Sequence, residues 1–321
     1  MWLNLTNKAY FHQILLLVLV LLMTLLQQIF SFSLPTQIVF FLSLTLTIGM
    51  FHGMLDIVLL SNAAFKKPRF LLMYALVACS VIVLLLKFQL LAVPILLVLS
   101  IWHFGELQRF DKPATNDYRD GLQQSYLLQN SLMRYVLGVN SLAAAFFLQG
   151  KSLYDIVFNI THMVDKMHIG WLVWSVLAMV WLPAIVILIG LYLVGAFDKQ
   201  ASYQAAMLET VIVWFAFAIL PIWLAFALYF AGFHAFRHIC DVLQQTSENT
   251  VYKMSFLQTH RFKIACIAIL TLLLVLFIFV QLSLQLVGLN AYQWLRMIVI
   301  LLAAVTLPHA ILVYFWRKKY F

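Results

Sequence analysis

Charged side chains are scarce in this 321-residue chain, since only 10% of its residues are Asp, Glu, Lys or Arg. Apolar residues make up 65%, and the mean hydropathy is +1.00. This balance excludes an ordinary soluble domain. The formal net charge of +9 does not indicate nucleic-acid binding, because the basic residues fall mostly in short segments between apolar runs, where they set membrane topology. We therefore expect an integral membrane protein.

Cysteine is also rare. The three cysteines, Cys79, Cys240 and Cys266, show no CxxC or paired spacing, so neither disulfides nor a thiolate metal site is indicated. The sequence also lacks the HExxH motif of zinc proteases and the G-x-S-x-G turn of serine hydrolases. No internal repeat stands out, and the segments between apolar runs are too short for a soluble domain. We expect one integral membrane domain over residues 1–321.

Long runs of apolar residues make up most of the sequence. A helix of about 20 such residues is long enough to cross the bilayer core. The runs predict an all-α fold, a polytopic transmembrane bundle of about ten helices. These helices are expected near residues 10–32, 36–62, 69–86, 90–108, 122–149, 169–196, 204–220, 222–243, 262–286 and 291–316. Only Leu220-Pro221 separates the seventh from the eighth, and a proline can kink a helix as well as end it, so nine helices are the alternative.

The distribution of lysine and arginine predicts the topology. With ten helices and an N-terminus in the cytoplasm, most basic residues fall in inner segments, including the C-terminal cluster Arg317–Lys319. The outer side receives only Lys87, Lys151, Lys166 and Arg296. Cytoplasmic segments carry the excess of Lys and Arg in membrane proteins. We therefore expect a multi-pass protein of the cell inner (plasma) membrane with both termini in the cytoplasm.

Apart from His12, which opens the first predicted span, five histidines fall inside predicted spans, where ionisable side chains are costly and usually face the bundle interior. The predicted topology places each of them roughly 5 to 10 residues before the cytoplasmic end of its helix, and therefore in one layer of the inner half of the membrane. Several imidazoles without a thiolate suit iron, copper or zinc. The pattern predicts a metal site toward the cytoplasmic half, formed by His52, His103, His234, His238 and His309.

The spacing of histidines and carboxylates along the predicted helices also supports a metal site. His234 and His238 are four residues apart, so both can project from one side of a helix toward one ion. Three carboxylates lie three or four residues from these histidines and are candidate hydrogen-bond partners of metal-bound imidazoles: Asp56, Glu106 and Asp241. Ion pairs with Arg134 or Arg237, or exposure at the membrane interface, are the alternative roles. Gly53 and Gly105 would allow close helix packing near the ligands.

In this order along a multi-spanning chain, the motifs resemble the Brp/Blh family of bacterial and archaeal membrane carotenoid dioxygenases. The matching segments are His52-Gly53 with Asp56, His103-Phe104-Gly105-Glu106, His234 through Arg237-His238, and Pro308-His309. The resemblance implies a non-haem Fe(2+) centre with four ligands, His52, His103, His234 and His238. It implies accessory roles for Asp56, Glu106, Arg237 and Asp241, with His309 as a nearby or substituting group.

The resemblance also implies an activity, the oxidative cleavage of β-carotene at its central 15,15′ double bond by O2 to give two molecules of retinal. The expected partners are β-carotene or a related carotenoid, O2 and membrane lipid, with an indirect functional link to a microbial rhodopsin. The residues alone leave two other functions open. One is an intramembrane zinc-dependent lipid hydrolase with Asp56 or Glu106 as the base. The other is a transporter or haem-binding membrane subunit, in which Asp56, Arg134, Glu209 and Arg237 form an ion path or paired histidines ligate haem.

Overall fold

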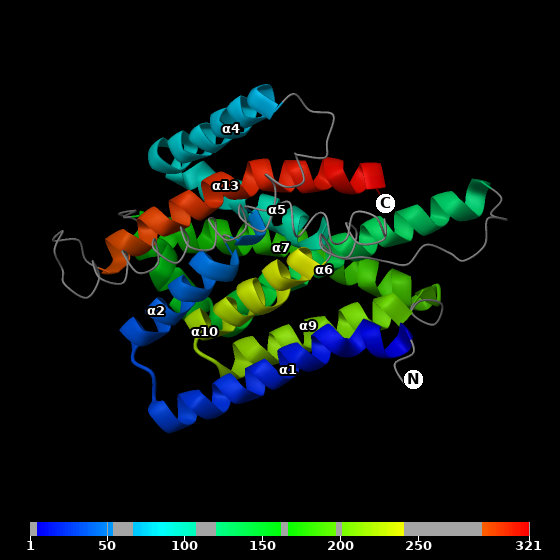
Figure 1. Ribbon diagram of the computed structural model, residues 1–321, viewed down its shortest axis with the longest axis horizontal. Coiled ribbons are helices and arrows are strands. Elements are labelled where there is room, and N and C mark those ends of the chain that lie inside the picture. The colour runs from blue at the N-terminus through cyan, green and yellow to red at the C-terminus, as the bar shows by residue number, and fades with distance from the viewer. Residues whose placement is uncertain are drawn as a thin grey trace, which may run out of the picture. The chain divides into compact units, whose positions relative to one another are not determined.

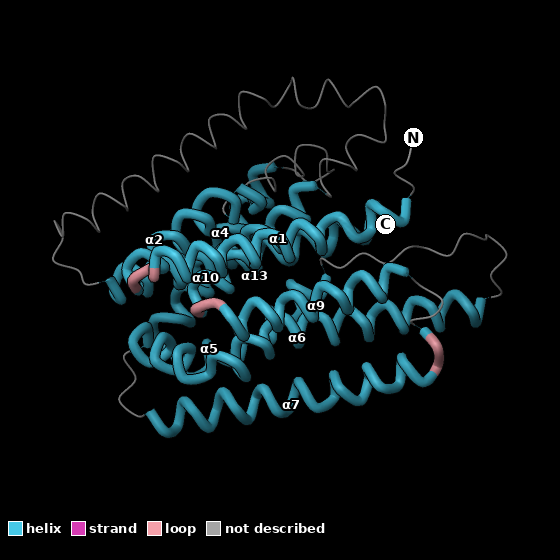
Figure 2. Tube along the Cα trace, turned by 90° about the horizontal axis from the view of Figure 1, so that it is seen from below, coloured by secondary structure: helices cyan, strands magenta, loops and turns pink. Residues whose placement is uncertain are grey.

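A computed structural model of the chain describes residues 5–49, 51–53, 67–106, 120–161, 166–196, 201–240 and 291–320. Within these ranges every regular element is a helix and no strand occurs (Figure 2). The predicted all-α class is confirmed for this part of the chain. The predicted ninth span at 262–286 lies outside the described residues, as do Asp56, Asp241 and Cys266.

Contacts divide the chain into two compact units (elements labelled in Figure 1). The first unit, residues 1–29, 93–158 and 162–225, contains α7 (Lys166–Leu193), α9 (Ala201–Ile219) and most of α1 (Leu5–Phe30), α5 (Gln89–Glu106) and α6 (Asp120–Thr161). The second, residues 30–92, 159–161 and 226–321, contains α2 (Leu34–Leu44), η1 (Thr45–Gly49), α4 (Lys67–Lys87), η2 (Leu228–Ala235) and α13 (Ala291–Tyr320). Residues of the short α10 (Ile222–Ala227) belong to both. The single domain over residues 1–321 stays a prediction.

Three described segments are long and apolar enough to cross a membrane: His12–Phe30, Leu34–Gly53 and Leu127–Ser152. Shorter apolar helices cover Leu72–Lys87, Ala178–Leu193, Tyr203–Ile219 and Ile300–Phe315. These helices support membrane association. The number of ten spans and the cytoplasmic position of the termini stay predictions.

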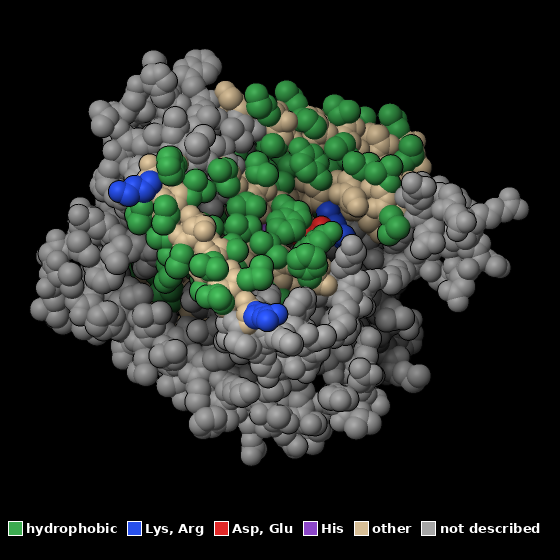
Figure 3. Space-filling model, turned by 90° about the horizontal axis from the view of Figure 1, so that it is seen from above, with side chains coloured by type: hydrophobic (Ala, Val, Ile, Leu, Met, Phe, Trp, Pro, Cys, Tyr) green, Lys and Arg blue, Asp and Glu red, His purple; other side chains and the backbone are tan. Residues whose placement is uncertain are grey.

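Helix α1 shows how its sequence suits a lipid environment. Residues three or four positions apart, among them Gln13, Leu16 and Val20, form its buried side. The opposite side exposes equally apolar residues, such as Ile14 and Val18. A helix that is apolar on both sides can pack against protein with one side and face lipid with the other. On the face drawn in Figure 3, the described side chains are likewise mostly hydrophobic.

Local sequence signals set several helix ends. Ser33 caps the N-terminus of α2, with its Oγ accepting from Thr36 N–H, and a proline occupies the first turn. After α7, Gly195 adopts a positive φ of 67°, the left-handed conformation that commonly ends helices. Helix α9 ends at Ile219, and α10 begins after Pro221, whose carbonyl accepts from Leu224 N–H and Ala225 N–H. The predicted boundary at Leu220-Pro221 is therefore a helix break.

Polar contacts in the first unit join α6 to its neighbours. Tyr135 Oη donates to the carbonyl of Val180 on α7, at 2.6 Å. At Gln149, where α6 kinks, the side-chain amide donates to the carbonyl of Phe217 near the end of α9, at 2.8 Å. The fully buried Tyr203 of α9 donates from its Oη to Asn130 Oδ1, at 2.7 Å. These bonds satisfy polar groups that an apolar interior leaves without water.

The Tyr203–Asn130 bond gives a stability prediction. Replacing Tyr203 by phenylalanine keeps the ring but leaves Asn130 Oδ1 without this donor. We expect a loss of about 1 kcal/mol of folding free energy, within the range measured for hydrogen bonds between membrane helices. Thermal unfolding in detergent micelles measures it. An unchanged transition would show that the bond contributes nothing to stability.

Candidate metal centre

Four of the five predicted histidines belong to the second unit, and unusual helical segments carry two of them. His52 follows the π-helix η1, and His234 lies inside the π-helix η2. His238 lies one turn farther along the same helical run. π-Helices are rare and occur frequently at functional sites. The segments η1 and η2 contact each other, so both wide turns meet where these histidines lie.

His309 reaches the same place from α13, directly after Pro308. A proline inside a helix removes one backbone N–H and weakens the preceding turn. In that turn the carbonyl of Val305 accepts from Tyr74 Oη of α4, at 3.3 Å. Helices α4 and α13 lie side by side (Figure 1). The contact with α4 therefore supports the part of α13 that presents His309.

The four rings of the second unit form a compact cluster. The ring centroid of His52 lies 4.9 Å from that of His309, 5.4 Å from that of His234 and 5.8 Å from that of His238. The rings of His238 and His309 are 5.4 Å apart. All four side chains are buried, and His238 is 0% exposed. The structure thus brings together three residues predicted as ligands and His309, whose role the sequence left least defined.

The spacing of these rings suits one metal ion. With a metal–nitrogen distance of about 2.1 Å, two imidazoles on one ion have ring centroids about 4.5–5.2 Å apart at octahedral or tetrahedral angles. The measured separations of 4.9–5.8 Å are at or slightly above this range. A ring nitrogen of His52 lies within 4.8 Å of one of His234. Small ring rotations would bring these nitrogens to one ion.

One ring nitrogen of His52 bears on metal binding. Its Nδ1 is buried and has no hydrogen bond of standard geometry within the described part of the chain. A buried polar atom without a partner is costly, and more so in an apolar bundle. A metal ion bound by this ring would offset that cost. The donor set and this atom together fit a metal that prefers imidazole nitrogen, such as iron, copper or zinc.

His103 belongs to the first unit, where glycines fix its helix against α6. It is buried, and its ring lies 5.9 Å from that of Phe104. A Cβ on Gly105 would collide with the carbonyl of Arg134, and one on Gly138 with the carbonyl of Ile101. Helices α5 and α6 therefore approach backbone to backbone on both sides of His103. For Gly105, the predicted close packing is confirmed.

Gly53 behaves differently from Gly105. A Cβ built on Gly53 meets nothing within 4 Å among the described residues. The predicted role of this glycine in close helix packing finds no contact in that part of the structure. Gly49, three residues before His52, has the tight contact instead, against the ring of Phe230.

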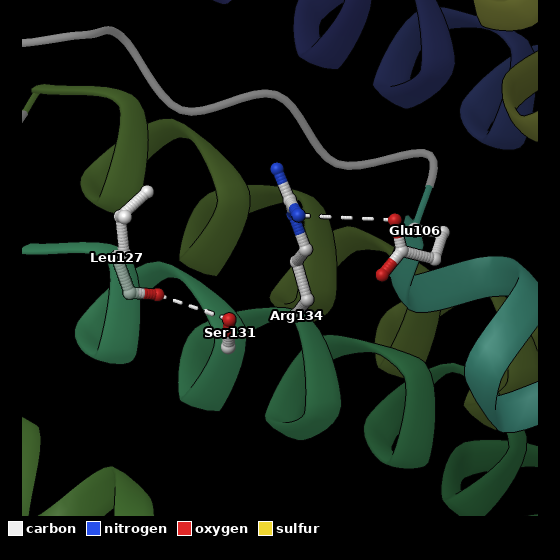
Figure 4. A network of polar contacts seen from close by, with 4 residues as sticks. All are labelled: Glu106, Leu127, Ser131 and Arg134. Carbon is white, nitrogen blue, oxygen red and sulfur yellow. Dashed lines mark hydrogen bonds and ion pairs between the residues drawn. The ribbon is translucent and has the colours of Figure 1, made fainter. Parts of the chain in front are cut away.

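Glu106, predicted as a hydrogen-bond partner of a metal-bound imidazole, makes an ion pair with Arg134. Figure 4 shows Arg134 extending from α6 toward the carboxylate at the end of α5, with 3.7 Å between Arg134 Nη1 and Glu106 Oε2. On the neighbouring turn of α6, Ser131 Oγ donates to the carbonyl of Leu127 (Figure 4). The ion pair is the alternative role that the sequence had left open for Glu106.

Two other charged residues that the sequence singled out, Arg237 and Glu209, lie in different units of the structure. The guanidinium of Arg237 lies over the ring of Phe233, 4.1 Å from its centroid, in a cation–π contact within the second unit. Glu209 is buried in α9 of the first unit. The structure thus gives Arg237 a local aromatic contact beside His238.

A row of aromatic rings, not predicted from the sequence, ends at the histidine cluster. Phe41 of α2 lies 5.7 Å from Phe226, which stacks at 6.1 Å on Phe230. Phe230 in turn stacks on His234, with centroids 5.5 Å apart and planes 16° apart. The sequence signal for this row is the four-residue spacing of Phe226, Phe230, His234 and His238.

Comparison with known proteins identifies a family. The sequence model of the family described as beta-carotene 15,15'-dioxygenase matches residues 42–317, a range that includes all five histidines. No curated protein and no solved structure gives a significant match. The matched range contains the whole histidine cluster of the second unit and all of the aromatic row except Phe41, which directly precedes it.

Proposed function

This chain belongs to the beta-carotene 15,15'-dioxygenase family, and we propose that it cleaves β-carotene at the central double bond with O2, at a non-haem iron centre. Family membership implies a carotene dioxygenase. The observation that supports the metal centre best is the cluster of four buried imidazoles in the second unit. Such a donor set is costly to bury in an apolar bundle unless it binds something.

We assign the Fe(II) ligands as His52, His103, His234 and His238. His309 contacts both His52 and His238, which supports it as an accessory group that constrains those rings or replaces a ligand. Asp56 and Asp241 are proposed as hydrogen-bond partners of ligating imidazoles, as such carboxylates commonly are. Bound iron would supply O2 activation, while the protein supplies orientation and a dry environment.

The proposed reaction breaks the C15=C15′ double bond and forms one C=O bond on each carbon. Both oxygen atoms of O2 enter the products, one in each retinal, so no external reductant is required. The apolar polyene is dissolved in lipid, and the apolar helices would let it enter laterally from the bilayer. We propose the inner membrane as the location, with the site in its cytoplasmic half, and a rhodopsin as the indirect user of the retinal.

Isotope labelling tests this function. Protein loaded with Fe(II) under anaerobic conditions is mixed with β-carotene in detergent and exposed to ¹⁸O2, and the aldehyde is reduced at once to retinol to prevent exchange with water. We expect two retinal equivalents per β-carotene, each with one ¹⁸O, by mass spectrometry. Iron-loaded protein that forms no apocarotenal would contradict the proposal, and products of unequal length would contradict the cleavage position.

The same preparation separates the alternatives. A zinc-dependent lipid hydrolase would contain zinc and turn over without oxygen. A haem-binding subunit would show a haem absorption spectrum after purification. Metal analysis and a visible spectrum of the protein as purified, before iron is added, therefore distinguish the iron, zinc and haem centres.

A further inference from the structure

One side of the helical run that carries His234 and His238 presents a ladder of rings in four-residue steps. The ladder consists of Phe226, Phe230, His234 and His238. The planes of Phe226 and Phe230 differ by 5°, and those of Phe230 and His234 by 16°. Its first three rings are thus nearly parallel.

The π-helix η2 affects how the four rings line up along this run. In an α-helix of 3.6 residues per turn, a step of four residues overshoots one turn by about 40°. A π-helix closes its hydrogen bonds over five residues, so its turn is wider and the same step falls short. The run changes from α-helix at 222–227 to π-helix at 228–235 and back to α-helix at 236–240. Four-residue steps in the α-helical parts rotate by more than one turn and those in the π-helical part by less, so the two deviations in angle oppose each other. The ladder therefore stays on one side of the helix.

Phe230 is the ring at which two chain segments meet. One of its faces stacks on His234, while His52 approaches with its ring at 80° and its centroid at 5.8 Å. Gly49, three residues before His52, lies against the Phe230 ring so closely that a Cβ there would overlap it. Phe230 thus contacts both candidate ligands and the backbone that carries one of them.

We propose that Phe230 is a positioning residue, which fixes the ring planes of His52 and His234 so that their nitrogens are held for one metal ion. The proposal rests on the metal site of the proposed function. A phenyl ring that limits imidazole rotation lowers the conformational entropy lost when metal binds, as packed residues around designed sites do. Gly49 has a part in this, since only a residue without a side chain leaves room for the ring.

Two variants test the proposal without depending on turnover. Phe230→Leu removes the stacking face but keeps an apolar side chain. Gly49→Ala keeps Phe230 but displaces its ring, and the contacted atoms belong to a side chain that can move, so the fold is expected to survive. Controls are Phe215→Leu, at a 40% exposed position on α9, and Gly190→Ala, where an added Cβ meets nothing within 4 Å of described atoms.

The measurements are anaerobic Fe(II) affinity and the electron paramagnetic resonance spectrum of the nitric oxide adduct, which reports ligand geometry. We expect Fe(II) affinity to fall by about 10-fold in both variants, at the lower end of losses seen when groups that orient ligands are replaced. We also expect an altered spectrum in the two variants. The two control proteins should have the Fe(II) affinity and the spectrum of the parent. Parent affinity and an unchanged spectrum in the two variants would overturn the proposal. If Phe230→Leu does not fold, Gly49→Ala alone decides by the same criterion.

The experiment separates this inference from the function on which it rests. A parent protein that binds no Fe(II) would overturn the proposed iron site, and the positioning role with it. A parent that binds Fe(II) tightly, together with variants that match it, would overturn the positioning role alone.

Discussion

Replacement of His238 by alanine is expected to abolish turnover and to remove bound iron. Its side chain is 0% exposed, and its ring lies 5.8 Å from that of His52 and 5.4 Å from that of His309. Removing a ligand costs more than the roughly 10- to 100-fold lost when a ligand's hydrogen-bond partner is replaced. We therefore expect activity below about 1% of the parent, measured as retinal formed per minute, with iron content by mass spectrometry.

A matched control is His12→Ala, since His12 lies on α1 in the first unit and outside the cluster. This variant should keep parent iron content and turnover. His238→Ala also leaves a cavity, so its unfolding temperature and gel-filtration profile must be compared with the parent. A folded His238→Ala protein that keeps both iron and turnover would remove His238 from the ligand set.

Gly138→Ala is expected to cause the largest loss of stability. The added Cβ would overlap the carbonyl of Ile101, a backbone atom on the neighbouring helix that cannot rotate away. Overpacking commonly costs about 1–3 kcal/mol, and a backbone collision belongs at the upper end. Helix α5 would have to move away from α6, and His103 would move with it. We expect a lower unfolding temperature in detergent and weaker Fe(II) binding.

Gly190→Ala is the matched control for this change. Gly190 also lies in an apolar helical segment, Ala178–Leu193, but an added Cβ meets nothing within 4 Å in the described structure. Alanine has the higher helix propensity, so this variant should be as stable as the parent or slightly more stable. Equal unfolding temperatures for Gly138→Ala and the parent would show that α5 and α6 can separate without cost.

The sequence predicted the helices and the histidines because both leave strong local signals. Apolar runs gave helix positions that agree with α1, α4, α5 and α9 to within a few residues. Burial of His52, His103, His234, His238 and His309 is also as predicted. A histidine in an apolar run is conspicuous because burying an ionisable side chain requires a reason.

Other features could not be predicted because they depend on contacts between distant segments. Whether Gly138 or Gly53 meets a neighbouring backbone depends on helix packing, and nothing in either local sequence distinguishes them. The π-helices have no composition signal of their own, so the straight ladder from Phe226 to His238 was not predicted. The ion pair of Glu106 with Arg134 required the register of α5 against α6, which the two glycines set.

The wide separation of the clustered histidines along the chain has a consequence for biosynthesis. His52 is in the second predicted span, whereas His309 is in the last helix. No nascent chain that ends before Pro308 contains the complete cluster, however many earlier helices have already entered the bilayer. Under the proposed function, any contribution of His309 to the metal site therefore arises late in translation, after the assigned ligands His52, His103, His234 and His238 have all been synthesised.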